Sequence, residues 1–500
     1  MPRWPRANDE YPPRLRSFLR PHVDTSRVSL RSILLDPELA WSDQTTITFP
    51  NSAGFVEATE RWTVFEAPTY QAALQPATEA DVIKAVKLAT RFNIPFLATG
   101  GRHSYTTTLG KLHDGLAIDL SQLDTVEIDK VAETVTVGPG VIINDILDPL
   151  FDAGFIIRTA FCPGVIGVTI GGGVGRFAGI FGLMLDALVS VRIVTATGNL
   201  IEASQTSNPE LFWAIRGAGA NFGIITSAIY KVHPLSKVPN DGRIFTVDFQ
   251  FPNNMSSPFY KAVESLNDKL PPELAGLSFV NYNSTTNQAQ VVSNWVYLGT
   301  EKNAREALAP IFELNVAPTS AKIVTWNKLI NSPFNNDVAT LCQRGGLRDI
   351  YSANFRNYSA ATYDTLFDKM SKFYDKYPGG RNSALQLEFY PNQAMKRVPT
   401  TATAWPWRDA TGYMNVAAIW SDGDQYTAEA AKSLALDLRD EVAATAGYPD
   451  LSVFINYAHG DEKLEQIYGV DNSARLASLK KKWDPNHVFS FNNGLPTQYH

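Results

Sequence analysis

The sequence predicts an α+β protein made of two parts that are built differently. Residues 69–234 mix short apolar strands with helices and are dense in glycine, whereas the residues beyond 241 form longer strands separated by amphipathic helices. Runs of strands with helices between them favour an antiparallel sheet covered by helices on one face. The length of 500 residues agrees with two or three structural units, at roughly 100–200 residues for each unit.

Composition and charge exclude several classes of protein. The chain has 44 basic and 50 acidic residues and no basic stripe, so no nucleic-acid partner is expected. It has no apolar run of about 18 residues, so no membrane span is expected. The charged N-terminus lacks the apolar segment of a secretory signal, which favours a cytoplasmic or other intracellular location. Its two cysteines, Cys162 and Cys342, allow one bridge but no disulfide scaffold, and the oligomeric state stays open.

The first part opens with a well-marked helix, predicted over 82–92 after a capped first turn. Thr78 is suited to cap this helix, and Glu79 and Asp81 place negative charge where the helix dipole favours it. The other elements expected here are strands at 94–99, 116–120, 189–195 and 224–232, a hairpin of 126–129 with 134–137, and a helix at 141–151.

The second part follows a polar, proline-containing stretch at 237–241. Its expected strands are 244–251, 277–282, 289–297, 384–389, 414–420 and 453–457, and its expected helices are 258–270, 303–314, 361–373 and 428–446. A final helix is expected from residue 474, before a terminal loop.

A strand that runs into two glycines and a histidine is the first motif that could support chemistry. Its sequence is Thr99-Gly100-Gly101-Arg102-His103-Ser104-Tyr105. Glycines let a ligand approach the backbone closely, and a histidine at such a position can be a nucleophile, an acid–base group or a metal ligand. Taken alone, the motif is more often an ordinary loop. No second histidine or carboxylate stands at metal-ligand spacing, so no metal site is predicted.

The second motif is glycine-rich, with seven glycines among the sixteen residues of 164–179. Each glycine inside an element weakens it by roughly 0.5–1 kcal/mol compared with alanine. The segment also leaves backbone N–H groups free to bind phosphates, so we expect a large ligand rather than an empty turn region. A third motif joins a short helix, for which Asn208 is a suitable cap, to a glycine loop at 217–223.

Together these motifs have a recognisable order. The chain resembles the flavin oxidoreductases of the vanillyl-alcohol-oxidase (PCMH) type, and within them the berberine-bridge-enzyme-like oxidases of fungal secondary metabolite biosynthesis. Four segments support the resemblance: 101–105, 167–176 with 182–186, 208–223, and 456–493. It implies an N-terminal extension packing on the body (1–65), a PCMH-type FAD-binding domain of two α/β subdomains (66–236), a substrate-binding domain (237–470) and a C-terminal berberine-bridge-like segment returning to the FAD domain (471–500).

The resemblance implies FAD as the cofactor. In the family, the histidine that matches His103 is bonded through its ring to the flavin 8α-methyl group, which fixes the flavin and raises its redox potential. Many relatives add a second bond from a cysteine to flavin C6. Here that position falls on Ala160, two residues before Cys162, so one covalent bond is favoured over two. The remaining FAD contacts are expected from Gly100, Gly101, Arg102, Ser104, Gly164, Gly167, Gly171, Gly172, Gly173, Gly175, Gly223, Ile224, Asn492 and Asn493.

The resemblance also suggests catalytic residues. In the family, a hydride leaves the substrate for the flavin while a side chain removes a proton. Tyr105 matches a family tyrosine and is the first candidate for that base or for an orienting hydroxyl. Glu388 and Asn415 stand on strands that form the other face of the pocket in relatives, and Tyr457 matches a tyrosine that often faces the flavin. No carboxylate occurs in 414–420, near which some relatives have a glutamate base.

The implied activity is that of an FAD-dependent oxidase acting on an alcohol, amine or phenolic small molecule, with dioxygen as the electron acceptor and hydrogen peroxide as a product. A dehydrogenase with another acceptor is an alternative, because Pro163 matches a position that governs oxygen access in relatives. A cyclase that uses the flavin as a scaffold is another. Several aromatic residues allow a bulky apolar or aromatic substrate, and His459 is expected either near the site or at the surface. The aromatic residues are Trp405, Trp407, Tyr413 and Tyr457.

Overall fold

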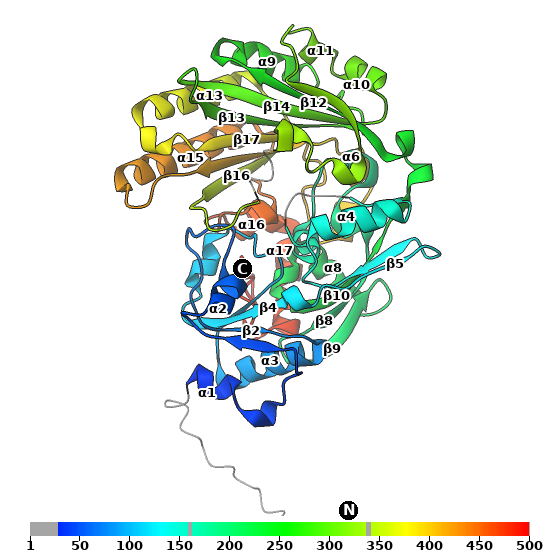
Figure 1. The fold of residues 1–500 in the computed structure, drawn as a ribbon, viewed down its shortest axis with the longest axis vertical. Helices are drawn as coiled ribbons and strands as arrows, with labels where there is room; N and C mark the ends of the chain where they lie inside the picture. Colours follow the sequence, from blue (N-terminus) through cyan, green and yellow to red (C-terminus); the bar gives the residue numbers. More distant parts are fainter. Residues whose placement is uncertain (1–28, 159–162, 337–341, 500) are drawn as a thin grey trace, which may run out of the picture. The chain divides into compact units, whose positions relative to one another are not determined.

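The computed structural model describes residues 29–158, 163–336 and 342–499 (Figure 1). The chain divides into two compact units, Met1–Leu39 and Ala40–His500. The described part of the first unit contains a short helix, α1 (Leu30–Leu34), capped by the hydroxyl of Ser29. Within the described residues, no helix is both long enough and apolar enough to cross a membrane.

A four-stranded sheet carries the loop that contains His103. Helix α3 (Glu79–Phe92) starts as predicted, with the Thr78 hydroxyl accepting a hydrogen bond from the Asp81 N–H group. The helix joins two strands of a parallel group, so the loop from residue 100 leaves the carboxyl end of the sheet. The strand order is β1 (Thr46–Thr48), β2 (Tyr70–Gln75), β4 (Gly115–Asp119) and β3 (Phe96–Thr99).

A second, five-stranded antiparallel sheet follows. It contains the predicted hairpin and the strand that begins at Ile224. Beside it, the glycine-rich segment forms helix α5 (Val165–Gly171), which Gly173 helps to end with a φ of 73°, where a Cβ atom would lie 2.3 Å from Met184. The strand order is β5 (Val126–Asp129), β6 (Thr134–Val137), β10 (Ile224–Lys231), β8 (Leu188–Val194) and β9 (Leu200–Ser204).

The second part of the chain builds a seven-stranded sheet in which all neighbouring strands are antiparallel, as predicted. Helices α9 (Ser256–Glu264), α13 (Ala360–Lys376) and α15 (Gln425–Thr445) cover one face (Figure 1). The strand order is β15 (Ser320–Thr325), β12 (Arg243–Phe251), β14 (Gln288–Leu298), β13 (Leu274–Asn283), β17 (Ala384–Phe389), β18 (Gly412–Ala418) and β16 (Asp349–Phe355).

One face of this sheet packs against the helices, and the other lines the cavity described below. On β17, Leu385, Leu387 and Phe389 belong to the apolar core shared with the helices. Because side chains alternate along a strand, Gln386 and Glu388 point to the opposite face. That face is turned toward the glycine-rich loops of the four-stranded and five-stranded sheets, and its side chains are described below.

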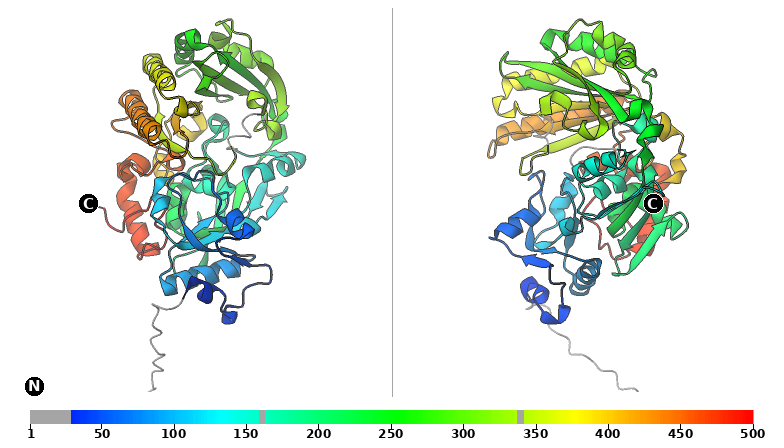
Figure 2. Two further views of the ribbon diagram at one scale, coloured as in Figure 1. Left: turned by 60° about the vertical axis from the view of Figure 1, so that its left-hand side comes forward. Right: turned by 45° about the vertical axis from the view of Figure 1, so that its right-hand side comes forward.

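The C-terminal helix returns to the first part, as the resemblance implies. Helix α17 (Val470–Trp483) packs against α8 (Pro209–Ala218), and Figure 2 shows it in red beside the blue-to-green part of the larger unit. Lys480 is completely buried there, where it pairs with Asp484 at 2.7 Å and donates to the carbonyl oxygen of Asn221. The hydrogen bond to Asn221 joins the last turn of α17 to the first part.

Two local predictions are wrong. Residues 453–457 are not a strand: Val453 bonds to Gln466, and Ile455–Tyr457 form a 3₁₀ turn, so this backbone is satisfied locally. Asn208 does not cap α8 through its side chain, because it adopts a φ of 48° and its amide donates to the carbonyl oxygen of Glu202.

Candidate active site

A cavity of about 1060 Å³ lies where the glycine-rich loops meet the exposed face of the seven-stranded sheet. It brings together residues that are almost 400 positions apart in the sequence. The predicted site residues that line it are Gly100, Gly101, Arg102, His103, Ser104, Tyr105, Gly164, Gly167, Gly171, Gly175, Gly223, Ile224, Glu388, Asn415, Tyr457 and Asn492.

Three predicted cofactor residues, Gly172, Gly173 and Asn493, are not among the residues that line the cavity. A Cβ atom on Gly172 would lie 2.7 Å from the ring of Phe454, and one on Gly173 would meet Met184, so both glycines serve protein packing. Asn493 is buried, and its side-chain oxygen accepts a hydrogen bond from the Thr106 hydroxyl. It therefore ties the C-terminal segment to the loop that follows His103.

The predicted second tether, Cys162, lies outside the described residues. Cys342 is disulfide-bonded. The choice between one and two flavin bonds therefore stays a prediction.

The cavity walls fit a large, flat cofactor. Among the described residues, no atom lies within 4 Å of the place where a Cβ atom on Gly167 would stand, so this face of α5 opens into the cavity. Gly100 and Gly101 let their loop pack directly against neighbouring backbone. Cβ atoms there would lie 2.1 Å from the carbonyl oxygen of Pro139 and 2.5 Å from the nitrogen of Gly164. The cavity volume of about 1060 Å³ lies just above the roughly 300–1,000 Å³ of small-molecule sites, which leaves room for a dinucleotide.

The loop that carries His103 is held by a buried ion pair and a ring stack. Arg102 has a φ of 55°, and its guanidinium pairs at 2.6 Å with Asp119 at the end of β4. The His103 ring is stacked on Trp62, with centroids 4.5 Å apart and an angle of 17° between the planes. Burial and the nearby charge of Arg348 lower the pKa of His103 to about 4, so the imidazole is neutral at pH 7.

On the sheet side, Glu388 is buried at the centre of a small polar cluster. The Tyr457 hydroxyl lies 3.1 and 3.0 Å from its two carboxylate oxygens, and the amide of Gln386 donates to it at 2.8 Å. Burial raises the pKa of Glu388 to about 7, against the opposing effect of the Tyr457 hydrogen bond. This carboxyl group is therefore divided between its two protonation states at neutral pH.

The other predicted catalytic side chains flank this cluster. Burial raises the pKa of both Tyr105 and Tyr457 well above the ordinary value of a phenol, so both hydroxyls are protonated at neutral pH. Asn415 lies on β18 beside Gln386 on β17, and its side-chain oxygen is buried without a hydrogen-bond partner among the described residues. Such an atom is available to a bound molecule.

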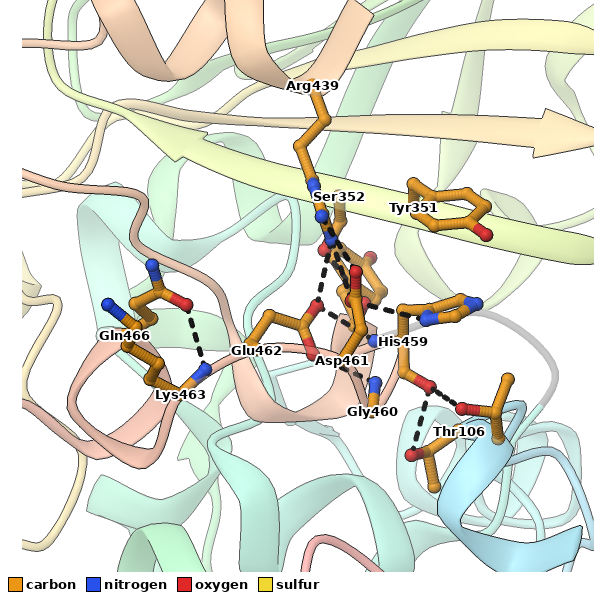
Figure 3. A network of polar contacts seen from close by, with 12 residues as sticks. Thr106, Tyr351, Ser352, Arg439, His459, Gly460, Asp461, Glu462, Lys463 and Gln466 are labelled. Atoms are coloured by element: carbon orange, nitrogen blue, oxygen red, sulfur yellow. Dashed lines mark hydrogen bonds and ion pairs between the residues drawn. The ribbon is translucent and has the colours of Figure 1, made fainter. Parts of the chain in front are cut away.

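His459 is not a surface residue, which corrects one of the two expectations for it. Its ring lies between Asp349, at 2.9 Å, and Asp461, at 3.2 Å, and the residue is 7% exposed. Figure 3 shows the side of the ring that faces Asp461. Burial alone would lower the pKa of His459, but the two carboxylates raise it to about 9. The histidine is therefore charged at neutral pH.

The network around His459 joins both parts of the chain. Arg439 on α15 binds both oxygens of Asp461 at 2.8 Å, and the carbonyl oxygen of His459 accepts hydrogen bonds from Thr106 and Thr107 (Figure 3). Sequence reasoning missed this network, because its members come from separate elements. The acidic residues that follow His459 were the available signal.

The sheet side of the cavity carries both apolar and polar side chains. Of the four aromatic residues expected to form it, only Tyr457 does so; Trp405 packs against Phe454 in the core, and neither Trp407 nor Tyr413 lines the cavity. The apolar part of the wall comes from the sheet and the loops beside it, namely Phe249, Leu277, Phe279, Val292, Leu329, Ile330, Phe334, Ile350 and Ile419. Polar side chains line it as well, namely Gln250, Asn281, Gln290, Thr319, Arg381, Asn382 and Ser383.

Comparison with known proteins places this architecture. The family model described as FAD binding domain matches residues 70–204, and the one described as berberine and berberine like matches residues 453–496. The chain is 44% identical over 488 residues to FAD-linked oxidoreductase fogF of Aspergillus ruber, covering 97% of each chain. It is 43% identical over 473 residues to FAD-linked oxidoreductase srdI of Neurospora crassa, covering 94% of this chain and 93% of that one.

Solved structures confirm the predicted α+β fold class. BBE-like 1 of Physcomitrella patens superposes with a TM-score of 0.81 at 24% identity, covering 95% of this chain and 100% of that one. The xylooligosaccharide oxidase of Myceliophthora thermophila, solved with xylobiose, gives a TM-score of 0.77 at 22% identity, covering 91% and 98%.

Proposed function

Because this chain belongs to the berberine-bridge-enzyme-like FAD-linked oxidoreductases, we propose that it is an oxidase whose base is Glu388. The substrate is an alcohol, an amine or a phenolic small molecule that loses a hydride and a proton. Bound FAD supplies the hydride acceptor, and dioxygen takes the two electrons to give hydrogen peroxide.

The observation that supports this proposal most is the contact between Glu388 and Tyr457 in the wall of the cavity. A base works best when its pKa lies near the working pH, and burial brings the pKa of Glu388 to about 7. The proton that leaves the substrate hydroxyl or amino group passes to this carboxylate, while Tyr457 orients it. Tyr105 is less suited than first expected, since its phenol is held in the protonated form.

The apolar part of the wall supports a substrate with a bulky apolar or aromatic body. The polar atoms of Glu388, Asn415 and Tyr457 can bind the reacting end of such a substrate.

We also propose that the flavin is bonded to His103. The neutral imidazole at the cavity wall and the glycine at position 167 support this assignment. Acid denaturation followed by peptide mapping tests it, with the flavin expected on the peptide that contains His103.

The oxidase activity is tested by peroxide release. The purified protein is offered aromatic alcohols, aromatic amines, phenols and xylo-oligosaccharides in air, and peroxide is expected with a member of the first three classes. If a substrate bleaches the flavin but the reduced flavin is reoxidised only slowly in air, the protein is instead a dehydrogenase.

A further inference from the structure

Trp62 is the side chain against which His103 is oriented. Its ring is 8% exposed and stacks on the imidazole, and it also contacts Tyr105, with centroids 5.9 Å apart. Its backbone N–H group bonds to the carbonyl oxygen of Arg102, next to His103 in the chain. Both the ring and the backbone of Trp62 therefore restrict where the imidazole can lie.

Arg348 contacts the same ring from the other part of the chain. Its guanidinium carbon lies 4.4 Å from the centroid of the Trp62 ring, and one of its nitrogens donates to the Trp62 carbonyl oxygen. Gly346 makes room for this arrangement, because a Cβ atom there would lie 2.6 Å from the guanidinium. Cation–aromatic contacts of this kind stabilise both partners.

The backbone that presents Arg348 is fixed to the backbone that presents Trp62. Val64 donates to the carbonyl oxygen of Gly346 at 3.0 Å, and Gly345 donates to that of Arg61 at 2.8 Å. The Thr63 hydroxyl donates to the carbonyl oxygen of Arg348 at 2.8 Å. The stack is therefore built on a paired segment rather than on a free loop.

We propose that Trp62 and Arg348 are positioning residues that hold the His103 ring, uncharged, for its bond to the flavin. The inference rests on the covalent attachment proposed above. Trp62 sets the plane of the imidazole, and the fixed charge of Arg348 opposes its protonation, which would remove the lone pair that attacks.

The attachment balances with dioxygen as the oxidant. One C–H bond of the flavin 8α-methyl group and the N–H bond of His103 break, and a C–N bond forms between them. The two hydrogens and two electrons released reduce dioxygen to hydrogen peroxide, and the attached flavin ends in the oxidised state. Neither Trp62 nor Arg348 exchanges a proton or an electron in this step.

The test measures how fast flavin becomes acid-stable on the full-length chain. The protein is produced under riboflavin limitation and mixed with FAD in air. Flavin bound before and after acid precipitation is then measured over time. We expect W62L and R348Q to attach flavin about 10- to 100-fold more slowly than the wild type, because small displacements of reacting groups cost this much. W62F keeps an aromatic ring at this position, so its rate of flavin attachment should lie closer to that of the wild type than the rate of W62L does.

R356Q is the matched control, since Arg356 lies 4.0 Å from the ring of Tyr448 in a similar stack that does not line the cavity. It should attach flavin at the wild-type rate. Flavin attachment in W62L and R348Q at the wild-type rate would overturn the inference. Slow attachment would also overturn it if weaker binding of FAD before the bond forms explained the whole effect. Release of all flavin from the wild type by acid would instead reject the covalent attachment itself, whereas peroxide release tests the oxidase activity separately.

Discussion

The hydroxyl of Tyr457 lies within 3.1 Å of both carboxylate oxygens of Glu388, although the two residues are 69 positions apart. The 3₁₀ turn that carries Tyr457 is held by Ser352 on β16, whose hydroxyl donates to the Tyr457 carbonyl oxygen at 2.7 Å. A buried carboxylate held by donors such as Tyr457 and Gln386 can keep a defined direction while its protonation state changes. This is the arrangement that a base in a dry cavity requires.

Replacement of the Glu388 carboxyl by an amide tests its role. E388Q keeps the shape of the side chain but cannot accept a proton, so flavin reduction should slow by about 10²- to 10⁴-fold. Anaerobic stopped-flow absorbance with a substrate from the peroxide screen measures this rate. E441Q, which alters a surface partner of Lys369, should leave it unchanged. A rate for E388Q within twofold of the wild type would reject Glu388 as the base.

The pH dependence of flavin reduction should report the same group. The base acts in its charged form, so the rate should rise with pH through a midpoint near the Glu388 pKa of about 7. Y457F removes a hydrogen bond that lowers this pKa, so its midpoint should move upward. A shift of about one to two pH units is expected, because hydrogen bonds to charged groups contribute roughly 1.5–3 kcal/mol.

Y499F is a suitable control for this shift. Tyr499 donates a hydrogen bond of 2.8 Å to Glu465, and neither residue lines the cavity. Its pH profile should match that of the wild type. A midpoint in Y457F that stays in place or moves downward would show that another group controls the profile.

The strands of the large sheet could be predicted where side chains alternate between an apolar and a polar face. Residues 384–389 alternate in this way, and β17 has the predicted bounds. All seven residues of β16 are buried, including Asp349, Ser352 and Asn354, so no alternation marked it as a strand. Residues 453–457 are apolar enough for a strand but lie beyond the sheet.

The site could be predicted only as far as local motifs reach. The glycines and His103 are contiguous enough to be recognised, and period two placed Gln386 and Glu388 on one face. The pKa of Glu388 could not be predicted, because it depends on burial and on Tyr457. The position of His459 stayed open between the site and the surface for the same reason, since Asp349 stands 110 positions before it. Trp62 lies in a segment without a readable pattern.

Two glycines of α5 should respond differently to the same substitution. G167A adds a methyl group that meets no atom in the part of the chain that the structure describes, so the flavin-free protein should be as stable as the wild type or slightly more stable. G171A places a Cβ atom 1.7 Å from the side-chain oxygen of Asn456, so it should lose about 1–3 kcal/mol of unfolding free energy.

Urea denaturation of the flavin-free variants and their flavin content after saturation with FAD measure the two effects. G167A should bind less flavin than the wild type, since its methyl group occupies the cavity. Normal flavin content in G167A would mean that the cofactor does not lie against this face of α5.

The pair of carboxylates around His459 should make stability depend on pH in a predictable direction. The pKa of His459 is raised to about 9 in the folded protein from an ordinary value near 6.5, so its charged form stabilises the fold. This contribution is fully present below pH 6.5 and is lost as the pH rises through 9. H459Q should therefore lower the unfolding free energy, on the order of 1–3 kcal/mol, at pH 6. The difference from the wild type should shrink by pH 9.5.

Thermal unfolding of both proteins from pH 6 to 9.5 measures the difference. H113Q replaces a histidine that is exposed to solvent, and its unfolding temperature should follow the wild type at every pH. Since the groups that face His459 are Asp349, Asp461 and the ring of Tyr351, a second variant can separate charge from packing. D349N keeps the shape of Asp349 but removes its charge, so it should move the loss of stability to lower pH. A difference between the wild type and H459Q that stays constant with pH would show that His459 contributes by packing alone.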